Sequence, residues 1–183
     1  MKYVVIGAGR VGGCLGARLA EHGKDVCLIS RGAHLRELEI NGLQMDTAWR
    51  GKYGIYSIEV SSAEQYTGYA DVIFVCAEEC APEELAVLAG NSAVPGTAAV
   101  LLSDSSEAET AIKDLVPGLE MYPAYPKVSA YISKPGTIRV DDPAFMIDFS
   151  LPGSGKNCPL LDDIAEDLRE CGITVMVPWA AAV

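Results

Sequence analysis

The sequence has no long apolar run, and it has few basic residues relative to acidic ones. Half of its 183 residues are hydrophobic, yet no apolar stretch approaches the roughly 20 residues that a transmembrane helix needs. Lysine and arginine number 14 against 25 acidic residues, and the net charge at pH 7 is −11. Nucleic acids and anionic membranes select basic faces, so we predict neither as a partner. The N-terminus already belongs to an expected strand, and we expect no signal peptide.

Metal ligands and paired cysteines are also scarce. The six cysteines form no C-x-x-C pair, and there are only two histidines, His22 and His34. Cys76 and Cys80 have a ligand-like spacing, but no second pair accompanies them, so we predict no metal site. We interpret the cysteines as reduced packing residues of a cytoplasmic protein, where disulfides are rare.

A glycine-rich turn near the N-terminus is the most informative motif. The apolar run from Tyr3 to Ile6 leads into a match to G-x-G-x-x-G, and an amphipathic helical segment follows it. In this setting Gly7 permits the tight turn, Gly9 lets backbone approach a pyrophosphate, and Gly12 allows close packing of helix and strand. The alternative is that these glycines are ordinary loop residues that bind no ligand. We predict that the turn binds a dinucleotide at the helix N-terminus, through Gly7, Ala8, Gly9, Arg10, Val11 and Gly12.

The end of the second expected strand indicates which dinucleotide. NAD-binding folds usually place an acid there for the ribose 2′-hydroxyl, whereas an arginine suits a 2′-phosphate. Ser30 and Arg31 follow this strand, and Asp25 opens it at the wrong end. We therefore predict NADP(H) as the cofactor, with Ser30 and Arg31 in its site. The alternative for Arg31 is a solvated surface arginine. Lys2 and His34 are candidates to join Arg10 and Arg31 in a locally basic site.

The rest of the chain alternates strands and helices, and the segment from Leu43 to Val60 is expected to be looser strand structure with irregular turns. Near-continuous apolar runs at 71–77 and 98–102 are typical of central parallel strands, and the alternation predicts an α/β fold of Rossmann type with a doubly wound, mainly parallel sheet. Ligands of such sheets lie outside the carboxyl ends of the strands. We therefore expect the glycine turn, Arg31, the stretch from Ala77 to Glu79 and the stretch from Ser103 to Ser105 to meet around one crevice, and we add Ala77 to the cofactor residues.

The C-terminal third has a different character. Three short strands are expected at 128–132, 136–140 and 145–149, followed by a helix at 159–171 and a closing strand at 173–177. Neither an internal repeat nor a long linker separates this part from the rest. We interpret it as a short strand-rich extension of the same sheet.

Four stretches carry a family resemblance: VVIGAGRVGGCLGARLAEHGKDVCLISRGAHLREL, ADVIFVCAEE, SKPGTIRV and CGITVMV. Together they make the chain similar to the N-terminal domain of ketopantoate reductases, which are NADPH-dependent 2-dehydropantoate 2-reductases. The resemblance covers nearly the whole chain. It implies that residues 1–178 form a single dinucleotide-binding domain, and that 179–183 are a tail where the family's all-helical substrate domain would begin.

The sequence departs from the family at three positions. A family lysine matches Glu78, a family asparagine matches Asp104, and the lysine that serves the family as general acid is missing after Trp179, where alanines follow. Reduction of a ketone needs a proton donor and a cation for the substrate carboxylate. Two acids in a cleft would instead repel such a substrate, unless both are solvated residues at its rim. We assign no catalytic residue and expect no autonomous reduction of ketopantoate.

These departures leave several functions open. The chain is oxidoreductase-like, but the sequence does not decide whether it is an active enzyme on a small-molecule substrate. One alternative is a non-catalytic module that reports NADPH to a partner, and another is a truncated oxidoreductase with a different substrate. An apolar face left by missing helices predicts weak self-association or a partner helical domain.

Overall fold

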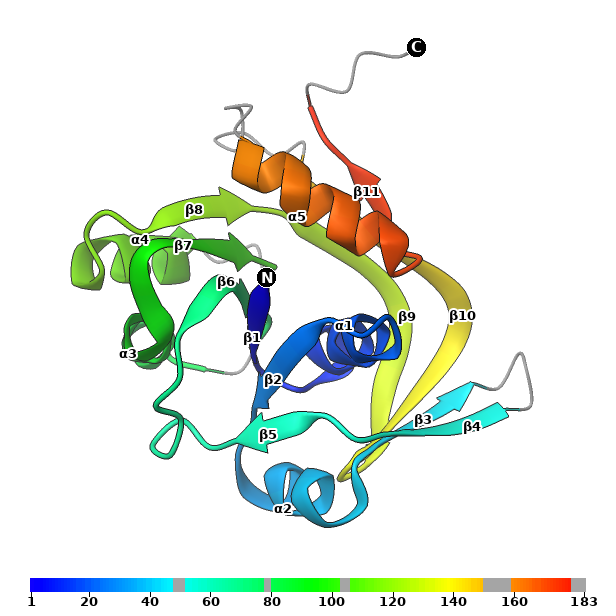
Figure 1. Ribbon diagram of the computed structural model, residues 1–183. Helices are drawn as coiled ribbons and strands as arrows, with labels where there is room; N and C mark the ends of the chain where they lie inside the picture. The colour runs from blue at the N-terminus through cyan, green and yellow to red at the C-terminus, as the bar shows by residue number, and fades with distance from the viewer. Residues whose placement is uncertain (48–51, 78–79, 103–105, 150–158, 179–183) are drawn as a thin grey trace.

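The computed structural model describes residues 1–47, 52–77, 80–102, 106–149 and 159–178 (Figure 1). These residues form two β-sheets, and the first helix of the chain lies between them. In the described part of the chain, no helix has both the length and the apolar character needed to span a membrane.

The larger sheet has six strands, all parallel, in the order β5-β2-β1-β6-β7-β8. They are β1 (Lys2–Ile6), β2 (Asp25–Ile29), β5 (Glu59–Ser61), β6 (Ala70–Val75), β7 (Ala93–Leu101) and β8 (Glu120–Pro123). The central strands are nearly continuous apolar runs because both of their faces are covered. In β1, the residues from Tyr3 to Ile6 are at most 1% exposed. The prediction of a doubly wound, mainly parallel sheet is confirmed.

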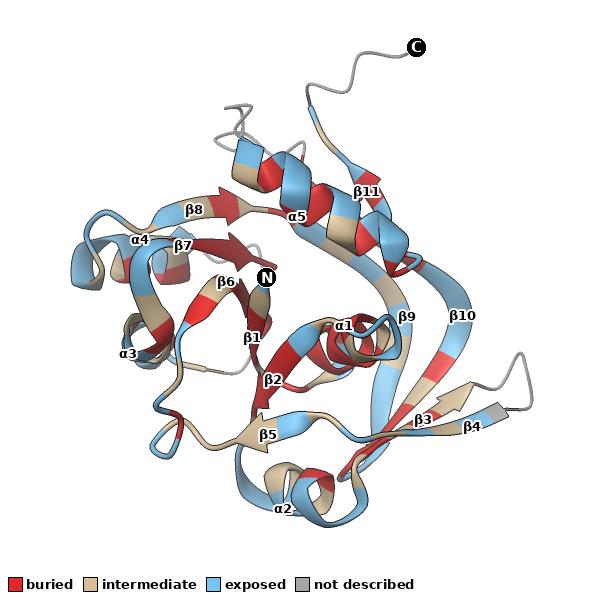
Figure 2. Cartoon of the chain, viewed as in Figure 1, coloured by how far each residue is buried: buried red, intermediate tan, exposed pale blue. Residues whose placement is uncertain are grey.

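Alternate residues of β1 face two different layers of helices. Tyr3 and Val5 pack in one hydrophobic cluster with α1 (Arg10–Glu21) and α5 (Pro159–Glu170). Val4 and Ile6 pack in a second cluster with α3 (Pro82–Ser92) and α4 (Ser106–Leu115). Successive side chains of a strand point to opposite faces, so one apolar run serves both clusters. Figure 2 shows the buried strands at the centre and exposed residues on the outer sides of the helices.

The C-terminal strands form a second sheet, and the prediction that they extend the first sheet is wrong. The second sheet has the order β11-β10-β3-β4, and β9 pairs with β10. Its strands are β3 (Leu43–Thr47), β4 (Lys52–Tyr56), β9 (Tyr125–Lys134), β10 (Thr137–Asp148) and β11 (Thr174–Met176). The physical reason is that β10 pairs in parallel with β3, so that Thr137 lies opposite Gln44. This sheet packs on the side of α1 that faces away from the first sheet (Figure 1).

Three further details differ from the sequence-based expectations. The three short strands expected between 128 and 149 are two long ones, β9 and β10, with register irregularities between them. The edge strand β8 was not expected, because two prolines, Pro123 and Pro126, lie close together at its end and are typical of loops. The segment from Leu43 to Val60, expected as loose strand structure, supplies β3 and β4 to the second sheet and part of β5 to the first.

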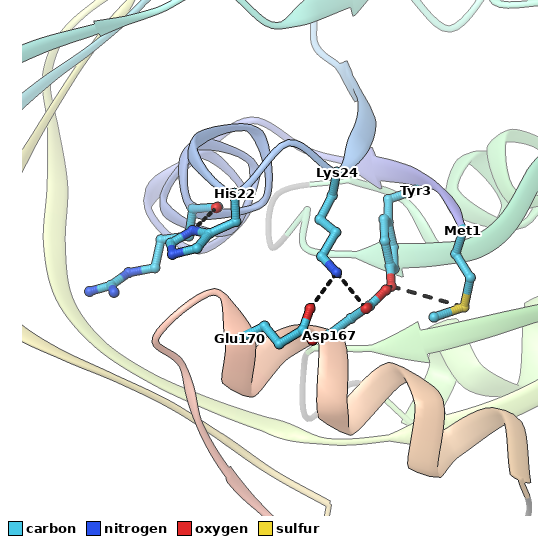
Figure 3. A network of polar contacts seen from close by, with 7 residues as sticks. Met1, Tyr3, His22, Lys24, Asp167 and Glu170 are labelled. Carbon is cyan, nitrogen blue, oxygen red and sulfur yellow. Dashed lines mark hydrogen bonds and ion pairs between the residues drawn. The ribbon is translucent and has the colours of Figure 1, made fainter.

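A polar network fastens α5 to the amino ends of β1 and β2 (Figure 3). The Tyr3 hydroxyl donates a hydrogen bond to Asp167, and Lys24 Nζ lies 2.6 Å from Asp167 Oδ1 and 2.7 Å from Glu170 Oε2. Burial, the hydrogen bond to Asp167 and nearby negative charge raise the pKa of Tyr3 far above its ordinary value. Partial burial raises the pKa of Asp167, but the bonds from Lys24 and Tyr3 outweigh it and hold this pKa below its usual range.

The same end of the sheet holds Lys2 and His22. The backbone N–H of Lys2 donates to Asp71, and the Lys2 ammonium lies 5.7 Å from the centre of the Tyr69 ring. Because β1 starts at Lys2, this residue lies at the opposite end of the strand from the glycine turn, and the suggestion that it joins the phosphate site is wrong. The His22 ring lies 2.9 Å from the carbonyl of Arg18 on its own helix, as a residue at a helix end.

Candidate functional site

A cavity of about 540 Å³ lies at the carboxyl ends of β1, β2 and β6. The glycine turn forms one wall, and Ser30, Arg31 and Ala77 follow the ends of the neighbouring strands. The remaining walls come from four other parts of the chain, namely α2 (Gly32–Asn41), the segment after β5, α3 with the residues before it, and β9. They contribute His34, Ala63, Glu64, Cys80, Glu84, Leu88, Tyr131 and Ile132.

The glycines of the turn differ in what surrounds them. Gly7 has φ +97, and a Cβ there would lie 2.8 Å from the backbone nitrogen of Ala77. A Cβ on Gly12 would lie 1.9 Å from the Gly7 carbonyl oxygen, whereas a Cβ on Gly9 would meet nothing within 4 Å. Gly9 therefore opens on the cavity and Gly12 faces the strand. Gly12 is the one residue of the predicted cofactor set that does not line the cavity.

His34 connects the glycine turn to the second sheet. The backbone N–H of Gly136, in the turn between β9 and β10, donates to His34 Nδ1 at 3.0 Å. Since Nδ1 accepts this bond, a neutral ring carries its proton on Nε2 and donates it to the Ala8 carbonyl, 2.8 Å away. The β9–β10 hairpin, whose Tyr131 also lines the cavity, is thereby held against the turn. His34 is a candidate for the site from its place in the sequence, but no local pattern signals this bridge.

Acidic side chains reach the end of β2 from elsewhere in the chain. Arg31 Nη1 lies 3.3 Å from Oε1 of Glu84, which is in the first turn of α3. Glu64 also lines the cavity, and hydrogen bonds from its own backbone N–H and from Ser62 hold its pKa below the usual range. The nucleotide-binding pattern in the sequence concerns only an acid at the tip of β2. Glu84 is 53 residues away from Arg31, and no local pattern signals the contact.

Burial keeps the thiol of Cys80, which lines the cavity, and those of Cys14 and Cys27, which do not, protonated at neutral pH. Burial raises the pKa of Cys80 to about 11, and its hydrogen bond to Glu84 adds to the effect. Burial likewise raises the pKa of Cys14 and Cys27 to about 12. Thiols with such pKa values are poor nucleophiles and poor metal ligands. Among the described residues, no group of three or more His, Cys, Asp or Glu side chains is arranged to hold a metal ion.

A second cavity, of about 890 Å³, lies beside the first and shares Arg10 with it. It is bounded by Leu102, which follows β7, and by residues of β9 and β10 that include Tyr125, Lys127 and Asp142. Two positively charged side chains, Arg10 and Lys127, thus reach this cavity.

The two acids singled out from the sequence, Glu78 and Asp104, lie outside the described residues, as do Glu79, Ser103, Ser105 and Trp179.

This strand order, the glycine turn into α1 and the cavity at the carboxyl edge define the class of Rossmann-type α/β domains. The family model for ketopantoate reductase PanE/ApbA matches residues 3–148. The chain belongs to this family.

Individual relatives share part of the chain. An uncharacterized oxidoreductase, YkpB, of Bacillus subtilis (strain 168) is 35% identical over 78 residues, which are 43% of this chain and 25% of that protein. A 2-dehydropantoate 2-reductase of Mesorhizobium japonicum is 46% identical over 46 residues, 25% of this chain and 14% of that protein. Both matches therefore cover only a minor part of the relative.

Solved structures show the same fold over almost the whole chain. The 2-dehydropantoate 2-reductase of Porphyromonas gingivalis W83 superposes with a TM-score of 0.82 at 24% identity, covering 98% of this chain and 64% of that one. D-mandelate dehydrogenase, solved with NADH and anilino(oxo)acetate, gives 0.81 at 20% identity, covering 96% and 56%. The chain thus spans less than two thirds of the length of these structures.

Proposed function

We propose that this chain is an NADP(H)-binding domain of a ketopantoate-reductase-like oxidoreductase. The observation that carries the proposal is the convergence of the predicted cofactor residues. Every one of them except Gly12 lines the cavity of about 540 Å³, although they come from three separate strand ends. The proposal treats residues 1–178 as one dinucleotide-binding domain, to which a helical substrate domain would be added.

The residues present fit a dinucleotide. Backbone N–H groups at the start of α1 would hold the pyrophosphate, favoured by the positive end of the helix dipole, and the open space at Gly9 leaves room for it. The Arg31 guanidinium would bind the 2′-phosphate of the adenine ribose. Leu88 of α3 and Ala63 provide apolar surface in the same cavity. When bound, the nicotinamide supplies or accepts a hydride.

The same proposal holds that the chain alone does not reduce ketopantoate. A carboxylate substrate requires a cation, and the alkoxide that develops on the ketone requires a proton. Glu78 and Asp104 stand where the family has lysine and asparagine. Two carboxylates at the positions of substrate-binding groups would oppose the binding of an anionic substrate.

A direct test is to titrate the purified chain with NADPH and with NADH and to detect binding by the nucleotide's fluorescence. We expect saturable binding of NADPH, tighter than that of NADH. Arg31→Met should weaken NADPH binding and leave NADH binding nearly unchanged, because only NADPH carries the 2′-phosphate. If neither nucleotide binds the unmodified chain, the proposed function is wrong.

Loss of catalysis is tested separately, by following NADPH absorbance in the presence of ketopantoate. We expect no oxidation above the rate without protein. Robust oxidation by the unmodified chain would overturn the claim of lost catalysis and leave the binding claim intact.

A second candidate is an oxidoreductase with a different substrate, a 2-oxo acid for whose carboxylate Arg10 and Lys127 would supply the cation that Glu78 does not. It is favoured by the similarity of the fold to D-mandelate dehydrogenase solved with NADH, and by the cavity that Arg10 and Lys127 reach. NADPH and NADH oxidation with a panel of 2-oxo acids, aromatic ones included, tests it. Turnover of any of them that Lys127→Met abolishes without weakening nucleotide binding would support this candidate, because Lys127 lines the second cavity and not the first.

A further inference from the structure

An acid stands beside the arginine that is proposed to select NADPH. Glu84 Oε1 and Oε2 lie 3.3 and 3.5 Å from Nη1 of Arg31, and both side chains line the same cavity. Arg31 is 67% exposed and Glu84 46% exposed, so each is open to an incoming ligand. The two residues reach the cavity from different elements, Arg31 from the end of β2 and Glu84 from α3.

Two features hold Glu84 in this place. It lies in the first turn of α3, after Pro82, where the helix dipole favours a negative charge. The Cys80 thiol, which is also in the cavity wall, donates a hydrogen bond to it. Glu84 is thus a carboxylate at the cavity wall whose neighbours are Arg31 and Cys80.

Such a carboxylate acts in opposite ways on the two nucleotides. A 2′-phosphate approaching Arg31 has to displace Glu84 from the guanidinium and then remain close to a like charge. A 2′-hydroxyl, by contrast, can donate a hydrogen bond to the carboxylate, which is the role that an acid at the tip of the second strand has in NAD-binding folds. The acid that is missing from the end of β2 is thus supplied by α3.

We propose that Glu84 is a specificity-determining residue, which weakens the selection of NADPH by Arg31 and gives NADH a partner for its ribose. The proposal rests on the proposed function, since it concerns the same cavity. It assigns the choice between the two nucleotides to a competition between one arginine and one glutamate.

The experiment measures dissociation constants for NADPH and NADH in the unmodified chain, in Glu84→Gln and in Glu83→Gln. Glutamine keeps the shape of Glu84 and removes its charge, so the ratio of Kd for NADH to Kd for NADPH should rise about two- to fivefold. Most of the change should be tighter binding of NADPH, and it should shrink at high salt because the cavity is open to solvent. Glu83 is the adjacent exposed acid of the same helical turn and does not line the cavity, so Glu83→Gln should leave the ratio unchanged.

The outcomes separate this inference from the function on which it rests. If the unmodified chain binds neither nucleotide, the proposed function itself fails. If it binds nucleotide and Glu84→Gln has the ratio of the unmodified chain, or if Glu83→Gln shifts the ratio equally, the role of Glu84 is refuted. Thermal melting without nucleotide confirms that each variant is folded, and Glu84→Ala provides a second variant that should shift the ratio in the same direction.

Discussion

Replacing Gly12 with alanine tests how closely α1 must approach the first strand. The added methyl group would lie 1.9 Å from the Gly7 carbonyl oxygen, 2.9 Å from Cγ1 of Val5 and 3.1 Å from Cβ of Cys76. The nearest of these atoms belongs to the backbone, and the Gly7 N–H is bonded to the Ile29 carbonyl, 2.9 Å away. The turn therefore cannot rotate away without breaking a contact between β1 and β2.

The size of the effect follows from two opposed contributions. Alanine is favoured over glycine inside a helix by about 1 kcal/mol. Overpacking costs about 1–3 kcal/mol when side chains can adjust, and more when backbone is in the way. Since the clash at Gly12 is with a carbonyl oxygen, the second contribution wins. We expect a net loss of about 2 kcal/mol or more in the free energy of unfolding.

Urea denaturation followed by circular dichroism measures this loss, and Gly9→Ala is the matched control. At Gly9 a methyl group would meet nothing within 4 Å, so the free energy of unfolding should change by less than about 0.5 kcal/mol. Nucleotide affinity should fall in Gly9→Ala, because the methyl group enters the space proposed for the pyrophosphate. Equal midpoints for Gly12→Ala and the unmodified chain would refute the reasoning.

Three further changes test other contacts. Asp167→Asn should lower the free energy of unfolding by about 1–2 kcal/mol in urea titrations, because it weakens the bonds from Tyr3 and Lys24. Since the pKa of Asp167 lies below its ordinary value, its contribution should be complete above about pH 4 and be lost as the pH falls further, so the variant should lose less stability in acid. His34→Ala should weaken nucleotide binding about three- to tenfold in calorimetric titrations, because it removes the bridge to the glycine turn. Gly136→Ala should cost about 1–3 kcal/mol of stability, because Gly136 has φ +74 and a Cβ there would lie 2.7 Å from Cβ of Glu37.

Each of these variants has a control in the same chain. Asp163→Asn alters an exposed acid of the same helix, and a loss equal to that of Asp167→Asn would contradict the role of the network. His22→Ala removes a histidine whose ring contacts the Arg18 carbonyl of its own helix and should leave nucleotide affinity unchanged. Gly23 has φ +71 with nothing within 4 Å of a Cβ, so Gly23→Ala measures backbone strain alone. A cost equal to that of Gly136→Ala would rule out the contact with Glu37.

The parallel sheet and the glycine turn could be predicted because their signals are local. Apolar runs such as the one at 71–77 identify strands buried on both faces, and the turn sits between a strand and a helix. The positions of Ser30, Arg31 and Ala77 around one cavity followed from the rule that ligands lie at the carboxyl ends of parallel strands. These parts depend on residues that are close in sequence or on a general property of the fold.

The parts that could not be predicted depend on partners far apart in the chain. The period of a strand tells which side chains share a face, but it does not tell which strand lies alongside, so the pairing of β10 with β3 had no signal. The contact between Arg31 and Glu84 and the bridge through His34 have the same origin. Weak self-association and the effect of Glu78 and Asp104 on catalysis stay predictions.

The chain passes from one sheet to the other three times, and this should make folding slow and cooperative. The chain enters the first sheet with β1 and β2, the second with β3 and β4, returns to the first with β5 to β8, and ends in the second with β9 to β11. Cleavage of the chain at one point therefore cannot separate the two sheets. Thr137, moreover, bonds to Gln44, which lies 93 residues earlier in the chain. Contacts of such long range make folding slow. We expect limited proteolysis to yield no stable fragment and unfolding to be one cooperative transition, so that the nucleotide cavity exists only when both sheets are complete.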